Sequence, residues 1–365
     1  ALDPSFEIPK EWKLALGARW NFDAGFMGEG YRLLFDYLHT RKEDSAILRD
    51  ATLEQFGTAP DGRPLYRSID RSVAACSQRP IPAACPNRSF TQDFILSNVQ
   101  GDDGESDVYS LALTKAYDWG LDWTFGYAYT DATEVTPMTS SVAFSNYANI
   151  SVSDPNNPAV STSNYNIKNR FTVQMNYRKA FFGDNETKIT LYGRVNEGRP
   201  YSPVFVDGGN VFGDTIDDRH LLYVPTGPSD PLVVFGSGFN QAAFFSYLEA
   251  NDLTKYAGSI APRNSIDGPW WHKFDLRIAQ EIPSFVEGHK FDLFLVVENL
   301  GNLIDDDWGV FYEQAFPHNV QLVEFTRNAT TNQYNYNTFV NPPQGPARDP
   351  DANLWEIRFG LKYTF

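Results

Sequence analysis

Apolar and polar residues alternate at the end of the chain with the period of a β-strand. From Trp355 to Phe365 every odd-numbered residue is apolar, while the even-numbered residues include Glu356, Arg358 and Lys362. Successive side chains of a strand point to opposite faces, so this segment has one apolar and one polar face. Aromatic residues at both ends of the apolar face and a terminal Phe are typical of the closing strand of a transmembrane β-barrel. The last strand of a soluble β-sandwich also alternates, so one strand does not decide between these folds.

The same alternation recurs in eight further segments. They span residues 12–20, 31–37, 109–113, 121–129, 171–177, 189–195, 274–278 and 291–297. The sequence therefore predicts an all-β protein in which about nine strands form an antiparallel sheet.

The spacing of aromatic residues favours a membrane over a sandwich. Trp12 and Trp20 lie on one face, eight residues apart, which is about 27 Å of strand. Tilted by about 40°, such a strand spans an outward apolar band near 25 Å tall, with one Trp at each interface. A sandwich strand is usually shorter and has its bulkiest aromatic residues in the middle. We therefore expect a portion of a transmembrane antiparallel β-barrel.

The connections between these segments alternate in length. The short ones are residues 23–29, 118–120, 182–187 and 284–290, and the long ones are residues 42–107, 134–167, 205–267 and 305–353. Outer-membrane barrels have short periplasmic turns and long extracellular loops. Within the long loops, residues 93–98 indicate an extra strand. Asn240 is a candidate N-cap for one short helix that follows it.

Composition is consistent with a barrel. Aromatic residues make up 15% of the chain, mean hydropathy is -0.39, and no run of about 18 apolar residues occurs. The net charge of -16 argues against a nucleic-acid partner. The acidic runs 102–105 and 305–307 lack the spacing of a calcium loop, so we interpret them as solvated loop ends and expect no metal or other cofactor.

Cys76 and Cys85 are the only cysteines. They close a short Pro-containing segment with no histidine nearby to complete a zinc site, which predicts one local disulfide and an oxidising compartment. A pair of free thiols is the alternative.

No catalytic constellation is visible, and we expect no enzyme activity. The histidines are scattered and a Gly-x-Ser-x-Gly motif is absent. The candidate functional residues are arginines predicted to face the barrel lumen, namely Arg170, Arg178, Arg194, Arg277 and Arg358. They can contact a plug or steer anionic solutes, or they can simply be solvated or paired wall residues.

Two further alternatives concern polar pairs and loop aromatics. Asp275 and Glu298 fall on adjacent predicted strands, where ion pairing with a lumen arginine is favoured over a pair of carboxylates. The loop aromatics are interpreted either as an external binding surface or as packing between loops; they are Tyr201, Phe205, Phe212 and Tyr223.

Several segments together resemble the late barrel of the Oar-like TonB-dependent receptors. They are residues 196–201, 218–225, 260–264, 269–270, 275–281 and 298–303, in matching order and rough spacing over nearly the whole chain. The resemblance implies an outer-membrane receptor of a Gram-negative bacterium, with a 22-stranded barrel plugged by an N-terminal domain. Nine strands is an odd number and the chain begins at Ala1 without Met or a signal peptide. We therefore expect residues 1–365 to be a fragment, the C-terminal part that holds the last nine strands.

The resemblance also implies partners and a function. The partners are outer-membrane lipid, the protein's own plug domain, the TonB complex and the barrel-assembly machinery, for which Tyr363 and Phe365 would form the recognition signal. The plug and the carboxypeptidase-like N-terminal domain lie outside this chain. The favoured function is TonB-dependent transport of an unidentified ligand. A structural or adhesive outer-membrane protein is the alternative, and a passive porin is a third and weaker one.

Overall fold

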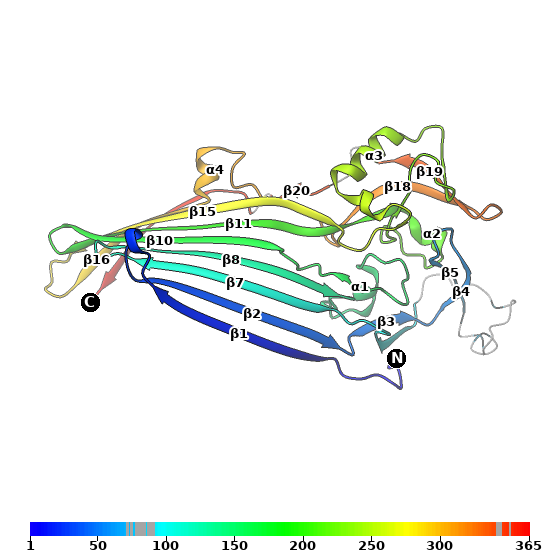
Figure 1. Cartoon of the computed structure of the whole chain (residues 1–365), viewed down its shortest axis with the longest axis horizontal. Helices are drawn as coiled ribbons and strands as arrows, with labels where there is room; N and C mark the ends of the chain where they lie inside the picture. The colour runs from blue at the N-terminus through cyan, green and yellow to red at the C-terminus, as the bar shows by residue number, and fades with distance from the viewer. Residues whose placement is uncertain (71–72, 74–75, 77–84, 86–91, 341–344, 350–351) are drawn as a thin grey trace.

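The structure, a computed structural model, describes residues 1–70, 73, 76, 85, 92–340, 345–349 and 352–365. Its main feature is a sheet of long antiparallel strands in the spatial order β1-β2-β7-β8-β10-β11-β15-β16-β21 (Figure 1). Their bounds are β1 Lys10–Phe22, β2 Tyr31–Glu43, β7 Glu105–Ala116, β8 Leu121–Glu134, β10 Asn169–Phe182, β11 Asn185–Val206, β15 Ile266–Pro283, β16 Lys290–Glu298 and β21 Glu356–Thr364. These nine strands correspond to the nine alternating segments, so the predicted all-β fold is confirmed.

The register places the apolar residues of every long strand on one face. Leu16 lies opposite Tyr37, and Leu113 lies opposite Phe125. At the other end of the sheet Leu295 lies opposite Phe359. Directly opposite residues of antiparallel strands share a face, so one apolar face runs from β1 to β21.

The two ends of the sheet differ, as the connection lengths predict. Short turns join the strands at one end, where the C-terminus also lies, and the long loops gather at the other end (Figure 1). The turn between β7 and β8 needs Gly120, which has a φ of 102°. Any Cβ at this position would collide with the carbonyl oxygen of Arg178 on β10, so the turn packs closely against its neighbour.

The sheet is open along two edges. Among the described residues β1 pairs only with β2, and β21 pairs only with β16. Since neighbouring strands of the nine are antiparallel, the first and the ninth run in the same direction, towards the turn end (Figure 1).

The long loops fold into a second region, which we call the cap. The end of β11 extends beyond the nine-stranded part of the sheet and pairs in parallel with β18 (Asn319–Asn328). Strand β19 (Gln333–Phe339) pairs with β18 and with β13 (Val233–Phe235). Shorter pairs complete the cap: β3 (Ala46–Asp50) with β6 (Phe94–Asn98), β4 (Leu53–Thr58) with β5 (Pro64–Ser68), β12 (Tyr223–Val224) with β14 (Ser259–Ile260), β17 (Tyr312–Glu313) with β20 (Ala347–Arg348), and β9 (Ser161–Thr162) with β8. The extra strand predicted near residues 93–98 is therefore β6.

The cap contains more helices than expected. Helix α3 (Gln241–Ala250) begins after Asn240, whose side chain accepts a hydrogen bond of 3.1 Å from the Ala243 amide, so the predicted cap residue is confirmed. Expecting only one helix was wrong, because α1 (Ala143–Ala148), α2 (Gly208–Phe212) and α4 (Leu300–Ile304) are also present, with a 3-10 turn at Leu253–Tyr256. Another 3-10 turn, Gly25–Met27, lies at the opposite end of the sheet, in the short connection between β1 and β2. At five or six residues, these three helices are too short to create an amphipathic period in the sequence. Within the described residues, no helix has both the length and the apolar character to cross a membrane.

An aromatic core stabilises the cap. Phe205 stacks on Phe325 with ring centroids 3.9 Å apart, and Tyr336 lies between Phe205 and Phe244. The loop aromatics of the sequence analysis, Tyr201, Phe205, Phe212 and Tyr223, are all buried in this core. Of the two interpretations, packing between loops is therefore the one that the structure supports.

Candidate functional site

The apolar face of the sheet is exposed and edged with aromatic side chains. Trp12, Trp20 and Phe359 are 68%, 62% and 77% exposed. Near the turns, ring contacts form a row from Trp20 through Phe22 and Tyr31 to Trp123, with centroids 4.7, 5.5 and 6.3 Å apart. A second row lies nearer the long loops and follows ring contacts between Tyr37, Tyr109 and Tyr129. Phe35 and Leu111 lie opposite each other between the two rows and are also exposed.

The opposite face carries the five candidate arginines. Their cross-strand partners place all of them on this face, which we call the polar face; the pairs are Arg170 with Asn196, Arg178 with Lys188, Arg194 with Lys273, Arg277 with Val296 and Arg358 with Val296. All five arginines therefore lie on the face opposite the apolar one, and their exposure to a lumen stays a prediction.

The five arginines differ in what they contact. Arg358 pairs with Glu298 at 2.5 Å and with Glu356 at 2.6 Å. Arg178 approaches Asp122 at 3.7 Å. The two remaining contacts are with rings: Arg194 lies 4.5 Å from the centre of Trp271, and Arg277 lies 5.3 Å from that of Phe294. Arg170 is exposed and, within the described part of the chain, its side chain makes no hydrogen bond or ion pair.

The carboxylates of adjacent strands are bridged by a lysine. Lys273 Nζ lies 3.9 Å from Asp275 and 3.8 Å from Glu298. Glu298 also pairs with Arg358, as the ion-pairing interpretation predicts, whereas Arg277 covers a ring instead. A shared cation of this kind leaves no isolated carboxylate pair for acid–base chemistry.

Buried arginines tie the loops of the cap together. Arg219 pairs with Asp214, donates to the Tyr147 carbonyl and is fully buried. His220 Nε2 lies 2.9 Å from the other Asp214 oxygen. Burial acts to raise the pKa of the Asp214 carboxyl, but the adjacent His220 and Arg219 outweigh burial and hold that pKa below its ordinary value. Asp214 is therefore ionised at neutral pH.

Two further arginines make similar links. Arg63 pairs with Asp61 at 2.7 Å and donates to the Leu221 carbonyl at 2.8 Å. Arg263 donates to the carbonyls of Glu134 and Val135, and its burial lowers its pKa to about 10. Each guanidinium thus joins segments far apart in sequence. Sequence reasoning missed these roles, although Arg219 and Arg263 lie in segments that carry the family resemblance, because no local pattern indicates which loop carbonyl an arginine will reach.

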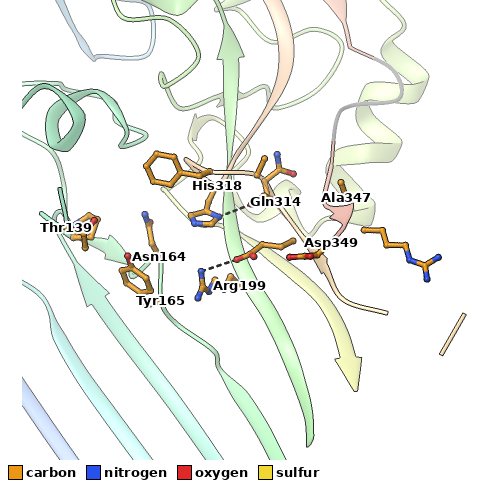
Figure 2. A pocket seen from close by; sticks show the side chains of 13 residues that line it. Thr139, Asn164, Tyr165, Arg199, Gln314, His318, Ala347 and Asp349 are labelled. Atoms are coloured by element: carbon orange, nitrogen blue, oxygen red, sulfur yellow. Dashed lines mark hydrogen bonds and ion pairs between the residues drawn. The ribbon is translucent and has the colours of Figure 1, made fainter. Parts of the chain in front are cut away.

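A cavity of about 590 Å³ opens where two long loops meet the cap end of β11 (Figure 2). Arg199 at the cap end of β11 pairs with Glu313 of β17 at 3.0 Å. The Arg199 guanidinium also lies 5.5 Å from the centre of the Tyr165 ring. His318 Nδ1 lies 2.9 Å from the Gln314 carbonyl oxygen. The remaining lining residues are Pro137, Thr139, Asn164, Ala315, Phe316, Ala347, Arg348 and Asp349.

The cavity was not predicted from the sequence. Its residues come from the loop before β10, from β11 and from both ends of the last long loop. Tyr165 and Phe316 are aromatic residues within polar loops, which is the local signal in the sequence that could have indicated this place.

The cysteine pair and one acidic cluster are the two other features that bear on possible chemistry. Cys76 and Cys85 are joined by a disulfide, the pairing expected from their spacing. Asp305, Asp306 and Asp307 are exposed with carboxylate oxygens within 4.8 Å of one another, the one such group found in the described residues. They follow α4 at the surface, as solvated loop ends do.

Comparisons with known proteins do not assign the chain to a family. No protein-family model matches the chain, and no curated protein matches it with significant similarity. The function is therefore inferred from the two faces of the sheet and from the cap.

Proposed function

We propose that this chain is part of the barrel wall and external cap of an Oar-like TonB-dependent outer-membrane receptor that takes up a ligand. The observation that carries the proposal is the apolar face of the nine strands, with large side chains exposed between two rows of aromatic rings. An apolar face of this extent is unfavourable in water, whereas lipid solvates it and aromatic rings prefer the two interfaces of a bilayer.

The open edges support closure by further strands. β1 and β21 run in the same direction, so pairing them directly would give a parallel pair. An odd number of additional strands closes the barrel with antiparallel pairs throughout, and closure is what satisfies edge backbone groups in lipid. The difference between the 22 strands of plugged outer-membrane transporters and the nine present here is thirteen, which is odd.

The polar face supports a wet lumen with a plug. Its charges are satisfied within the wall at Arg178 and Arg358, while Arg170 has no partner among the described residues. In the proposed receptor Arg170 contacts the plug or solutes in the lumen. A structural or adhesive role is the second candidate function, and it is supported by the cap, whose packed core and buried arginines make a rigid outer surface.

The experiment that tests the proposal alters strand β21, the edge strand that has to pair when the barrel closes. Tyr363→Ser together with Phe365→Ser in the full-length protein removes aromatic residues at the turn end of β21. We expect less heat-modifiable protein in the outer membrane and more degradation in the periplasm, because a terminal aromatic anchors the last edge for pairing. Phe144→Ser with Phe316→Ser, two exposed aromatics of the cap, is the matched control. Normal outer-membrane levels of the first double variant would contradict the proposal.

Transport and adhesion are separated by energy dependence. Loss of TonB or of the proton gradient is expected to abolish the contribution of an uptake receptor to growth. An adhesive protein would keep its surface function under both conditions.

A further inference from the structure

We propose that the cavity between Tyr165, Arg199 and His318 is the external capture site, and that its ligand is a neutral, polyhydroxylated molecule, that is, a carbohydrate. The inference rests on the proposed function only in that the cap faces the external medium. The cavity volume of about 590 Å³ falls in the range of small-molecule sites.

The charges that line the cavity are balanced. Arg199 and Arg348 are matched by Glu313 and Asp349, and Arg199 already pairs with Glu313 at 3.0 Å. An anionic ligand would meet the two carboxylates and the protein's net charge of -16, while a cationic ligand would meet the two guanidinium groups. Balanced walls therefore select against ligands of either net charge.

A zwitterion, such as the free end of a peptide, gains little at these walls. To form two ion pairs, a zwitterion has to separate Arg199 from Glu313. The existing ion pair is then replaced by new ones, and at partly exposed positions each pair contributes little binding free energy. Hydroxyl groups behave differently, because each donates and accepts. A hydroxyl can bridge Arg199 and Glu313 without breaking their contact.

The cavity retains hydrogen-bonding capacity on several sides. The guanidinium of Arg199 has five N–H donors. Among the described residues it donates one hydrogen bond, to Glu313, so donors remain available for a ligand. His318 uses Nδ1 on the Gln314 carbonyl, which leaves Nε2 for a ligand. Figure 2 shows Asn164, Arg199 and His318 around one space, so donors and acceptors converge on it.

Two aromatic side chains supply the apolar part of such a site. Tyr165 and Phe316 line the cavity and are 54% and 66% exposed, from different loops. A sugar ring presents C–H groups on its faces and hydroxyls at its rim. Exposed rings among planar polar groups complement both parts, because aromatic faces carry negative charge density that attracts C–H groups.

The test is direct binding by the full-length protein extracted in detergent. An array of neutral oligosaccharides is screened first, and the retained oligosaccharides are titrated calorimetrically beside a zwitterionic dipeptide and citrate. We expect saturable binding of neutral oligosaccharides and none of citrate. Tyr165→Ala and Phe316→Ala are each expected to weaken that binding about tenfold, as the loss of a ring contact worth ~1.4 kcal/mol would. Glu313→Gln makes the cavity net positive and is expected to lose affinity for sugar and gain affinity for citrate.

A matched control variant and a folding check distinguish loss of sugar binding from loss of the folded structure. Phe285→Ala removes an exposed aromatic from the turn end and is expected to leave sugar binding unchanged. Heat-modifiable migration of each sample reports folding. A folded protein that binds no oligosaccharide, prefers the dipeptide, or binds sugar equally well in both alanine variants overturns this inference alone. Sugar binding by a protein that does not reach the outer membrane overturns the proposed function and leaves the site standing.

Discussion

The sheet and the cap place their large apolar side chains on opposite sides. In the sheet, Trp20 and Phe359 are 62% and 77% exposed, whereas Phe205 and Phe244 in the cap are fully buried. Apolar surface leaves water wherever an alternative is available. The cap buries its large apolar side chains in its own interior, whereas the described chain contains nothing that covers the apolar face of the nine strands. The proposed function accounts for this difference by placing water around the cap and lipid against the apolar face of the sheet.

The largest effect is expected from emptying the cap core. Phe205→Ala removes a ring that stacks on Phe325, and truncating a buried Phe costs about 3–5 kcal/mol. Hydrogen exchange of the cap in detergent is expected to accelerate strongly. Phe359→Ala on the apolar face is the control, with little change in cap exchange. Equal effects of the two changes would remove the distinction between the regions.

Charge on the two faces of β1 tests the surroundings of the sheet. Leu16→Arg places a cation in the proposed lipid layer and is expected to destabilise the folded protein by roughly 2–4 kcal/mol if it lies near the midplane. Gly17→Arg faces the polar side, where the one tight contact of a new Cβ is with the Asp36 carboxylate at 2.9 Å, a flexible group that can move and pair with the arginine. Refolding of both variants into lipid vesicles measures the difference. Similar costs would show that the apolar face does not contact lipid.

Removing the disulfide tests whether a loop of the cap can lose stability while the sheet keeps its own. Replacing Cys76 and Cys85 by Ser opens a short loop and is expected to cost about 2–3 kcal/mol locally, with no change in the refolding of the sheet. Limited proteolysis is expected to cut this loop sooner in the double variant. Thiol labelling of the unreduced natural protein provides the check on the bond itself, since labelled cysteines would mean that it is absent.

The smallest expected effect is a pH dependence confined to the cap. Burial lowers the pKa of His220 below its ordinary value, although Asp214 opposes the shift. A neutral folded imidazole is favourable above the unfolded pKa of about 6.5, and this stabilisation is lost as the pH falls below that value towards the folded pKa. Opening of the cap, measured as exchange relative to the intrinsic amide exchange rate at each pH, is therefore expected to increase as the pH falls from 7.5 to 5, and less so in His220→Phe. An identical pH profile in that variant would exclude His220 as the cause.

The two regions also differ in how far sequence analysis could predict them. Strands such as β1 and β2 pair with their neighbours in the chain, so a period of two residues and a short turn are enough to place Leu16 beside Tyr37. The cap depends on contacts such as that of Arg63 with Leu221, 158 residues apart. No local pattern encodes such a contact, because a loop carbonyl has no sequence signature. The shared face of the five candidate arginines was therefore predictable, and the roles of the buried arginines and the cavity were not.

Strand β11 has a mechanical consequence. It is continuous from Asn185 to Val206 (Figure 1), and it pairs with β15 along most of its length and with β18 at its end. It carries Arg194 on the polar face and Arg199 in the cavity. A pull along this strand loads its hydrogen-bond ladders in shear, where many bonds bear the force together rather than opening one after another. In the proposed receptor β11 is then a stiff rod between the external cap and the barrel wall, and a displacement at the cavity reaches the polar face through one covalent chain.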